Sequence, residues 1–351
     1  MSTNITLGII GSGQLGSLLC QAAKKLKVKT IVISDDKNGP AQKFCDKFVY
    51  STYDNLENIQ NFVEKVDIVT YEFENIPFNI LQEIEKKKIV LPKSKINRTV
   101  QDRKKEKTFI NSLGIKTTEW AFIKSSKDIF KNINLLPGIL KTNTLGYDGR
   151  GQFVINSLDD VKKDWCFTAD YILEKKVDLK KEISVIMTRF QDNTESIYEP
   201  IENVHKDQIL NNSKIPADIN SKVFEECLLS TKKIAKNLDY VGTICVEFFL
   251  DKKNNLLVNE IAPRVHNSGH LTINSHNISQ FESHIRAVCN LENMPIKKIA
   301  NAEMINILGK QIDQFRIKSY KKNEFFFDYF KKEPKEKRKM GHLTILKNEI
   351  T

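Results

Sequence analysis

The sequence predicts a fold of mixed α/β and α+β class, with a parallel, doubly wound sheet at its N-terminal end. Over the first ninety residues, short apolar runs alternate with segments of helical spacing, a pattern typical of βαβ units. After residue 120 this alternation gives way to short strands separated by glycine turns. The change of pattern predicts separate domains, and 351 residues are enough for two or three.

The N-terminal elements follow from apolar runs and their spacing. ITLGII and KTIVIS are short apolar strands, and the segment between them has the spacing of an amphipathic helix. The full expected series has strands at 5–10, 29–34, 48–50, 67–72 and 88–90, and helices at 15–26, 56–63 and 78–87. The polar stretch that follows predicts a change of unit between residues 92 and 107.

The second half combines short strands with two helices. Residues 221–238 have the apolar spacing of one long amphipathic helix, and residues 243–262 predict a strand, a polar turn and a strand. The other expected elements are strands within 138–155, 171–177, 182–190 and 342–346, and a helix at 280–289.

Composition narrows the class of protein. The apolar fraction of 40% and the charged fraction of 28% are ordinary for a globular protein. The sequence contains no run of about 18 apolar residues, so we expect no membrane span. The N-terminus resembles a first strand, not a signal peptide. The six cysteines occur singly, which favours free thiols and a cytoplasmic protein.

The chain carries a net charge of +11, which indicates anionic partners. Basic residues are interleaved with acidic ones nearly everywhere, and the one dense basic run, at 331–339, has no nucleic-acid-binding motif around it. We therefore expect small anionic ligands in preference to nucleic acid.

A glycine motif follows the first strand. Gly11, Gly13 and Gly16 form GxGxxG, and Asp35 and Asp36 follow the second strand. This arrangement matches the dinucleotide fingerprint and favours an NAD-dependent oxidoreductase. The same glycines would also serve any closely packed first βα turn, whose helix N-terminus can bind a phosphate or carboxylate.

A second glycine-rich segment lies at 141–152. Lys141 ends a strand, and the loop Gly146–Gln152 follows it with the sequence GYDGRGQ. Glycines let backbone N–H groups approach phosphate oxygens, and the lysine adds a positive charge. A mobile hairpin tip is an alternative interpretation of the same residues.

The hairpin at 243–262 predicts a metal site. If the turn is 252–255 and residue 251 lies opposite 256, then Glu247 lies opposite Glu260 on one face. Two facing carboxylates are destabilising unless a cation lies between them, and such oxygens suit Mg²⁺ together with substrate phosphates. A protonated glutamate, or one paired with a lysine, is the alternative.

The stretch after this hairpin, NEIAPRVHNSGH at 259–270, is unusually rich in polar groups. With other motifs along the chain it resembles the ATP-grasp enzymes, and among them the N5-carboxyaminoimidazole ribonucleotide synthetase family of purine biosynthesis. The motifs that carry the resemblance are GSGQLG (11–16), YEFENIP (71–77), QDRKKEK (101–107), GYDGRGQ (146–152), ENVH (202–205), VEFF (246–249), NEIAPRVHNSGH, SQFESHIRAV (279–288) and RKMGH (338–342).

The resemblance implies an ATP-grasp fold with three parts. These are a Rossmann-like domain at 1–97, an ATP-grasp domain at 98–292 with a lid at about 120–178, and a small C-terminal domain at 293–351. It implies a homodimeric ligase that uses ATP, bicarbonate and Mg²⁺ to carboxylate 5-aminoimidazole ribonucleotide through carboxyphosphate. A formate-dependent transformylase is the alternative within the same fold.

The resemblance also implies roles for individual residues. Those near the reacting groups are Arg264, Tyr147, Asp148 and Arg150. The ATP site takes in Arg103, Lys141, Gly146, Tyr147, Asp148, Gly149, Arg150, Gly151, Gln152, Glu174, Lys175, Lys176, Val177, Glu182, His205, Asn259 and Glu260. The ribonucleotide site takes in Glu74, His266, Asn267, Arg338 and Lys339, and the metal ligands are Glu247 and Glu260.

Some positions depart from the pattern of that family. Asn143 replaces an arginine, Val265 a proline and Leu271 a tryptophan, and the segment 329–332 reads YFKK where the family has YGK. For Arg264 the residues leave two roles open: contact with a carboxylate or bicarbonate, or a buried ion pair with Glu72 or Glu74. For His266 and His270 the alternative to substrate contact is hydrogen bonding within a tight loop.

Overall fold

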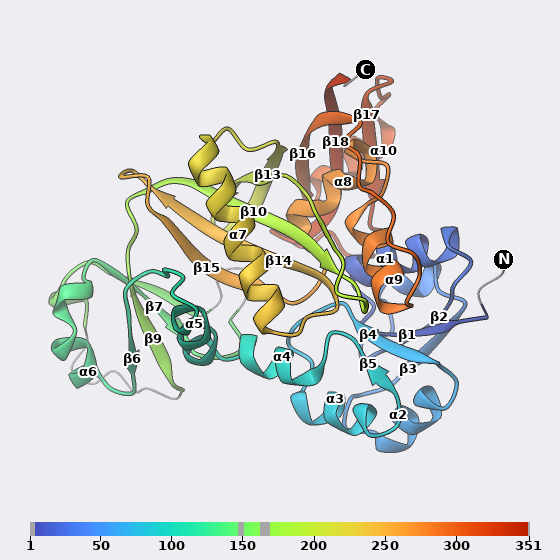
Figure 1. Ribbon diagram of the computed structural model, residues 1–351, viewed down its shortest axis with the longest axis horizontal. Coiled ribbons are helices and arrows are strands. Elements are labelled where there is room, and N and C mark those ends of the chain that lie inside the picture. Colours follow the sequence, from blue (N-terminus) through green and yellow to red (C-terminus); the bar gives the residue numbers. More distant parts are fainter. Residues whose placement is uncertain (1–3, 147–150, 162–168, 350–351) are drawn as a thin grey trace.

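The computed structural model describes residues 4–146, 151–161 and 169–349. In these residues the strands form three sheets (Figure 1). One belongs to the N-terminal domain, one forms a lid, and a large sheet runs through the centre into the C-terminal strands. The mixed α/β and α+β class predicted from the sequence is confirmed.

The N-terminal sheet is parallel, with the strand order β3-β2-β1-β4-β5. Helices cover both of its faces, so the predicted doubly wound arrangement is confirmed. Its elements are β1 (Thr6–Ile10), α1 (Gln14–Lys25), β2 (Lys29–Ser34), η1 (Pro40–Lys43), β3 (Lys47–Tyr50), α2 (Leu56–Val63), β4 (Ile68–Tyr71), α3 (Phe78–Glu85) and β5 (Ile89–Val90).

Two short helices lead from this domain to the lid. They are α4 (Ser94–Val100) and α5 (Arg103–Ser112). The lid sheet has the order β6-β9-β7-β8 and is antiparallel. Its elements are β6 (Trp120–Ile123), α6 (Ser126–Lys131), η2 (Ile133–Leu135), β7 (Gly138–Thr142), β8 (Gln152–Ile155), η3 (Leu158–Asp160) and β9 (Tyr171–Lys175).

The central sheet has the order β15-β14-β10-β12-β13-β16-β18-β17, and β11 pairs with β10. Because β13 pairs with β16, the C-terminal strands extend the central sheet and do not form a separate one. The strands are β10 (Leu179–Arg189), β11 (Glu195–Ile197), β12 (Ile201–Lys206), β13 (Ile209–Ile215), β14 (Gly242–Asp251), β15 (Leu256–Ala262), β16 (Ala300–Leu308), β17 (Glu324–Asp328) and β18 (Lys339–Glu349).

Side-chain alternation divides this sheet into a core face and a polar face. On β10, Ile183 and Val185 pack beneath α7 (Ser221–Asn237), as do Val246 and Phe248 of β14. The residues between them point to the opposite face, since successive strand residues alternate. That face carries Glu182, Ser184 and Glu247, so α7 fixes which side of the sheet can become a site. The remaining helices are η4 (Asn267–Leu271), α8 (Thr272–Ser275), α9 (Gln280–Val288) and α10 (Gln311–Ile317).

One apolar core joins the N-terminal domain to the rest of the chain. Helix α1 packs against α9, and Val265 and Tyr329 are buried in the same cluster. The residues of the N-terminal glycine turn are therefore held beside the loop that follows β15. Segments far apart in the sequence meet at this junction.

The described cysteines agree with the expectation of free thiols. Five cysteines lie in the described part of the chain, and all five are free thiols. Cys166 lies outside it. Within the described ranges no helix is long and apolar enough to span a membrane.

Candidate functional site

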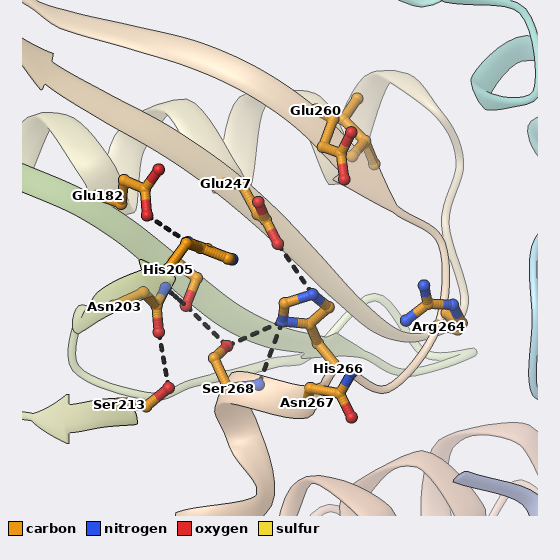
Figure 2. A network of polar contacts seen from close by, with 12 residues as sticks. Glu182, Asn203, His205, Ser213, Glu247, Glu260, Arg264, His266, Asn267 and Ser268 are labelled. Atoms are coloured by element: carbon orange, nitrogen blue, oxygen red, sulfur yellow. Dashed lines mark hydrogen bonds and ion pairs between the residues drawn. The ribbon is translucent and has the colours of Figure 1, made fainter. Parts of the chain in front are cut away.

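The β14–β15 hairpin places Glu247 directly opposite Glu260, as predicted, but the register near the turn was predicted incorrectly. Leu250, not residue 251, lies opposite Leu256. A bulge then inserts Asn259 between the pair Phe248–Val258 and the pair Glu247–Glu260. The extra residue corrects the register by one position, so both carboxylates face the polar side of the sheet (Figure 2).

Each of these carboxylates has a side-chain nitrogen of another residue within hydrogen-bonding or ion-pairing distance. Arg103 Nη1 lies 3.3 Å from Glu260 Oε2, and His266 Nε2 lies 2.8 Å from Glu247 Oε1. Burial acts to raise the pKa of Glu247, but its contact with His266 and the nearby His205 and Arg264 outweigh that effect and hold the pKa at about 2. Glu247 is therefore ionised throughout the neutral range and available as a ligand.

The donor set fits a magnesium ion that shares its coordination with a phosphate. No group of three or more His, Cys, Asp or Glu side chains within the described residues is arranged to hold a metal. Mg²⁺ characteristically takes one or two protein carboxylates and completes its shell with phosphate oxygens and water. The buried Asn259 Oδ1 has no hydrogen-bond partner in the described part of the chain. Glu247, Glu260 and this amide oxygen would hold the ion.

Helix α5 fixes the backbone around the bulge. Glu106 Oε1 accepts a hydrogen bond from the Ile261 N–H at 2.6 Å. Lys107 Nζ lies 3.4 Å from the Asn259 carbonyl oxygen. Consecutive residues of one helix thus hold the backbone on both sides of Glu260. The QDRKKEK motif therefore positions a proposed metal ligand, a function that was not predicted from the sequence.

Glu106 is fully buried, and burial together with the nearby Glu260 raises its pKa to about 8. A free glutamate has a pKa of about 4.3. Between these values the unfolded chain releases a proton that the folded chain retains, so Glu106 lowers the folding stability as pH rises. The slope is at most about 1.4 kcal/mol per pH unit.

We expect Glu106→Gln to remove this slope while keeping the oxygen that accepts the Ile261 N–H. The free energy of unfolding of the variant, relative to the parent, should therefore increase from about pH 5 to about pH 8. Urea unfolding at several pH values measures the difference. Glu225→Gln, on the exposed face of α7, is the control and should show no trend. A difference that is independent of pH for Glu106→Gln would contradict the assignment.

Lys141 reaches the lid end of the site from β7. Its Nζ lies 3.1 Å from Glu174 Oε2, and the buried Lys107 lies 3.3 Å from the other oxygen of Glu174. Burial acts to raise the pKa of Glu174, but the two lysines lower it to about 2. Burial also lowers the pKa of Lys141, against the opposing effect of Glu174. The Glu174 side chain thus anchors Lys141.

The glycine loop is described at its two ends. Gly146 O accepts from Arg103 Nη2 at 3.4 Å, and the Thr142 N–H donates to Gly151 O at 2.9 Å. Gln152 lies opposite Lys141 in the β7–β8 pair. Tyr147, Asp148, Gly149 and Arg150, which the sequence placed at the reacting groups, lie outside the described residues.

The other residues predicted to bind ATP lie at two places. Lys175 ends β9, and together with Lys176 and Val177 it lines a cavity of 1050 Å³ between the lid and the turn of the β14–β15 hairpin. Glu182 and His205 lie on adjacent strands of the central sheet, and the Glu182 carboxylate contacts His205 Nδ1 (Figure 2). Burial acts to lower the pKa of His205, but this contact raises it. The paired carboxylates Glu247 and Glu260 do not line this cavity. Of its lining residues, only Lys175, Lys176 and Val177 are therefore assigned to the site.

Arg264 forms the ion pair that was one of its two possible roles. Its Nε donates to the carboxylate of Glu74, and its Nη1 donates to Val265 O at 3.0 Å. The two side chains are 15% and 27% exposed, so both still border solvent. Burial acts to raise the pKa of Glu74, but Arg264 lowers it below its ordinary value. Both residues are therefore charged.

Three distant segments meet beside Arg264. Gln14 Nε2 donates to Asn267 Oδ1 at 2.6 Å, and Lys331 Nζ donates to Gln14 Oε1 at 2.6 Å. Lys331 also donates to Lys339 O at 2.7 Å, which places the predicted basic pair Arg338–Lys339 next to this junction. Gln14 and Lys331 were not predicted as site residues, although both lie in segments noted in the sequence.

The GSGQLG turn holds a carboxylate of its own chain. Glu72 accepts from the Gly13 N–H at 2.5 Å and from the Gly16 N–H at 2.8 Å. A Cβ atom at Gly13 would lie 2.5 Å from a Glu72 oxygen, so glycine is required there. The anion-binding capacity of this helix N-terminus is thus used internally. The dinucleotide interpretation of the motif was wrong.

The residues that depart from the family pattern have structural explanations. Asn143 is buried, and its Oδ1 accepts from the Lys104 N–H at 2.9 Å at the start of α5. Val265 and Leu271 are each at most 1% exposed and belong to apolar cores, and Tyr329, which the segment 329–332 shares with the family, is 2% exposed. His270 is also fully buried and packs against His342 and Phe281, so its role is structural.

A lid that carries a lysine and a glycine loop, facing a sheet that carries paired carboxylates, defines the chain as an ATP-grasp ligase. Family models agree along its length. A ribonucleotide synthetase preATP-grasp domain matches residues 4–101, an ATP-grasp domain matches 108–281, and a phosphoribosylaminoimidazole carboxylase C-terminal domain matches 302–351. The chain belongs to the N5-carboxyaminoimidazole ribonucleotide synthase family.

Curated proteins and solved structures support this membership over the whole chain. The N5-carboxyaminoimidazole ribonucleotide synthase of Brucella melitensis is 38% identical over 348 residues, covering 97% of this chain and 96% of that protein. The crystal structure of the Staphylococcus aureus synthetase complexed with ADP has a TM-score of 0.93 and 36% identity, covering 99% of this chain and 94% of that one. The Aspergillus clavatus synthase in complex with ADP and 5-aminoimidazole ribonucleotide has a TM-score of 0.89 and 26% identity, covering 99% and 95%.

Proposed function

We propose that this enzyme uses ATP and bicarbonate to carboxylate the exocyclic amine of 5-aminoimidazole ribonucleotide, as a step of purine biosynthesis. The observation that carries the proposal is the position of the Glu247–Glu260 pair. It lies between a lysine-bearing lid on one side and the Arg264–Glu74 pair on the other. Phosphoryl donor and acceptor could therefore meet over the carboxylates.

The nucleotide would bind between the lid and the central sheet. Lys141 and Arg103 would contact phosphate oxygens, since both are buried cations at the base of the glycine loop. Backbone groups at 174–177 would contact the adenine, because the Glu174 side chain is already paired with lysines. Glu182, held by His205, would accept from the ribose hydroxyls.

Bound Mg²⁺ on Glu247, Glu260 and Asn259 would neutralise charge on the nucleotide phosphates. The protein holds the metal-binding side chains in position before the nucleotide binds. The bulge, Glu106 and Lys107 do so at Glu260, and His266 does so at Glu247. Such preorganisation lowers the cost of reorganising the site during the reaction.

The ribonucleotide would bind at the junction of the three domains. Arg338 and Lys339 would meet its phosphate, and Asn267 and His266 would border its ring. Arg264 presents remaining guanidinium donors beside Glu74, and a guanidinium suits a planar carboxyl or bicarbonate group. Basic side chains would therefore face the phosphate of the ribonucleotide and the negative charge of bicarbonate.

The reaction would proceed in two steps. A bicarbonate oxygen attacks the γ-phosphorus of ATP, the bond to the β-phosphate oxygen breaks, and carboxyphosphate and ADP form. The amine nitrogen of the ribonucleotide then attacks the carboxyl carbon, phosphate leaves, and the nitrogen loses a proton. Phosphoryl transfer of this kind needs positioning and charge stabilisation more than a protein nucleophile.

We expect phosphate release from ATP and bicarbonate to depend on both 5-aminoimidazole ribonucleotide and Mg²⁺. A coupled phosphate assay measures it, with an unrelated aromatic amine as control. Formate in place of bicarbonate tests the transformylase alternative and should give no release. Release that is equal with the unrelated amine, or that requires formate, would contradict the proposed function.

The domain limits 1–97, 98–292 and 293–351, the homodimer and the cytoplasmic location are further parts of the proposal. The apolar junction between α1 and α9 supports a rigid join of the first two domains, not a flexible linker. The oligomeric state is open to measurement by sedimentation.

A further inference from the structure

A row of buried polar side chains crosses the polar face of the central sheet beneath η4 (Figure 2). It starts on β13, crosses β12 and β10, and ends at η4. We call it the buried polar chain, and its members are Ser213, Asn203, Ser184 and Ser268. All four are at most 5% exposed. Buried polar groups are costly unless they are hydrogen-bonded, so their arrangement across a sheet requires an explanation.

The hydrogen bonds of this chain have a defined direction. Ser213 Oγ donates to Asn203 Oδ1 at 2.8 Å, and Asn203 Nδ2 donates to Ser184 Oγ at 2.9 Å. Because Ser184 accepts from the amide, its own proton is free to donate. Its neighbour at 2.7 Å is Ser268 Oγ. Either hydroxyl of this serine pair could donate, and the bond at the far end of the chain decides which one does.

The chain ends on the imidazole of His266. Ser268 Oγ lies 2.8 Å from His266 Nδ1, and the Ser268 backbone N–H donates to the same nitrogen at 3.3 Å. A backbone N–H can only donate, so Nδ1 must be an acceptor and carry no proton. The remaining ring proton is then on Nε2, which lies 2.8 Å from Glu247 Oε1.

We propose that the buried polar chain holds His266 as the neutral tautomer protonated on Nε2, with that proton directed at Glu247. The tautomer of a histidine is set by the bond that its other nitrogen makes, and here two donors converge on that nitrogen. One oxygen of Glu247 is thereby fixed, and the other is left for a ligand. The members of the chain are positioning residues for a carboxylate that none of them touches.

The pairing of the strands places the buried polar chain on the same face of the sheet as the paired carboxylates. Ser184 lies directly opposite Glu247 on β10 and β14, and Asn203 lies directly opposite Ser213 on β12 and β13. The row therefore shares one face with the paired carboxylates. Each hydrogen bond donated along the row polarises the next, which strengthens a chain whose donors all point the same way.

The tautomer can be measured without substrates or metal. The protein is labelled with ¹³C and ¹⁵N in histidine, and the His266 signals are identified by their loss in His266→Gln. We expect nitrogen and Cδ2 shifts of the Nε2–H tautomer at neutral pH. A ring protonated on Nδ1, or on both nitrogens, would overturn the proposal whatever the Ser268 variants show.

Ser268→Ala removes the side-chain donor at Nδ1 and leaves the backbone donor. We expect a measurable population of the Nδ1–H tautomer and about a tenfold fall in turnover, with little change in the KM for ATP. Ser268→Thr keeps the hydroxyl, so it should retain the parental tautomer and the parental turnover. Unchanged histidine shifts together with unchanged turnover in Ser268→Ala would also overturn the proposal.

Thr188→Val is a matched control on the same strand. Thr188 is fully buried and its hydroxyl bonds to Thr243 at 2.8 Å across the same two strands, but among the described residues it makes no hydrogen bond to the His266 ring or to the buried polar chain. We expect parental histidine shifts and turnover. The role of Glu247 as a metal ligand rests on the proposed function, whereas the tautomer does not. An enzyme inactive toward the ribonucleotide would refute that function and leave the spectroscopic result standing.

Discussion

Glu260→Gln is expected to lower turnover by at least about a hundredfold while leaving the fold intact. The variant keeps the size and one oxygen of the side chain but removes the charge that would bind Mg²⁺ and the bridged phosphates. Loss of a single preorganised electrostatic contact in an active site costs about 10²–10³ in rate. Phosphate release over a range of Mg²⁺ concentrations measures the effect.

Stability should change little in this variant, because two small effects oppose each other. The ion pair of Glu260 with Arg103 is lost, and a pair with one partner 40% exposed is worth about 1 kcal/mol or less. Against this, the repulsion from Glu247 is relieved. Thermal melting separates a change of chemistry from a loss of fold, with Glu225→Gln as the control. Near-normal turnover at limiting Mg²⁺ would exclude a metal-binding role for Glu260.

Elements built from local patterns were predictable from the sequence. The N-terminal strands, the helix α7 and the hairpin follow from apolar periodicity, which depends only on neighbouring residues. The pairing of Glu247 with Glu260 was predicted from a wrong register and is correct because of the bulge at Asn259. Glu106 and Lys107 of α5 contact the backbone at this bulge across sequence separations of 155 and 152 residues. Such contacts cannot be inferred from the sequence of the hairpin itself.

Interactions between distant segments could not be predicted from spacing. The GSGQLG turn has every local feature of a dinucleotide site, yet the side chain of Glu72, the residue directly after β4, fills it. The buried polar chain gives even less signal, because nothing in the local sequence distinguishes Ser184, Asn203 and Ser213 from other polar residues of their strands. Their connection depends on the order of strands in the sheet, which the sequence alone does not state.

Arg264→Met is expected to lower turnover by about a hundredfold. The methionine keeps much of the apolar volume of the arginine stem but lacks its donors. If the guanidinium stabilises charge that develops on the bicarbonate-derived group, its loss acts on the transition state. ATP and Mg²⁺ binding should be nearly unchanged, because Glu247 and Glu260 are held by other residues. Single-turnover phosphate release and nucleotide titration measure the two quantities separately.

The same substitution should also cost stability, because Glu74 is left without its partner in a mostly buried site. Breaking one side of a buried ion pair costs about 3 kcal/mol. The double variant Arg264→Met with Glu74→Gln removes the unpaired charge, so it should regain much of that stability and none of the turnover.

Arg286→Met is the matched control for Arg264→Met. Arg286 pairs with Glu282 at 2.9 Å on α9, with side chains 14% and 20% exposed, and lies outside the proposed site. It should lose comparable stability and keep its turnover when folded. If Arg264→Met behaves like this control, melting early but turning over normally below its melting temperature, Arg264 is a structural ion-pair partner. If Arg264→Met is inactive at temperatures at which it is still folded, the guanidinium acts in the reaction itself, since a loss of stability cannot explain that result.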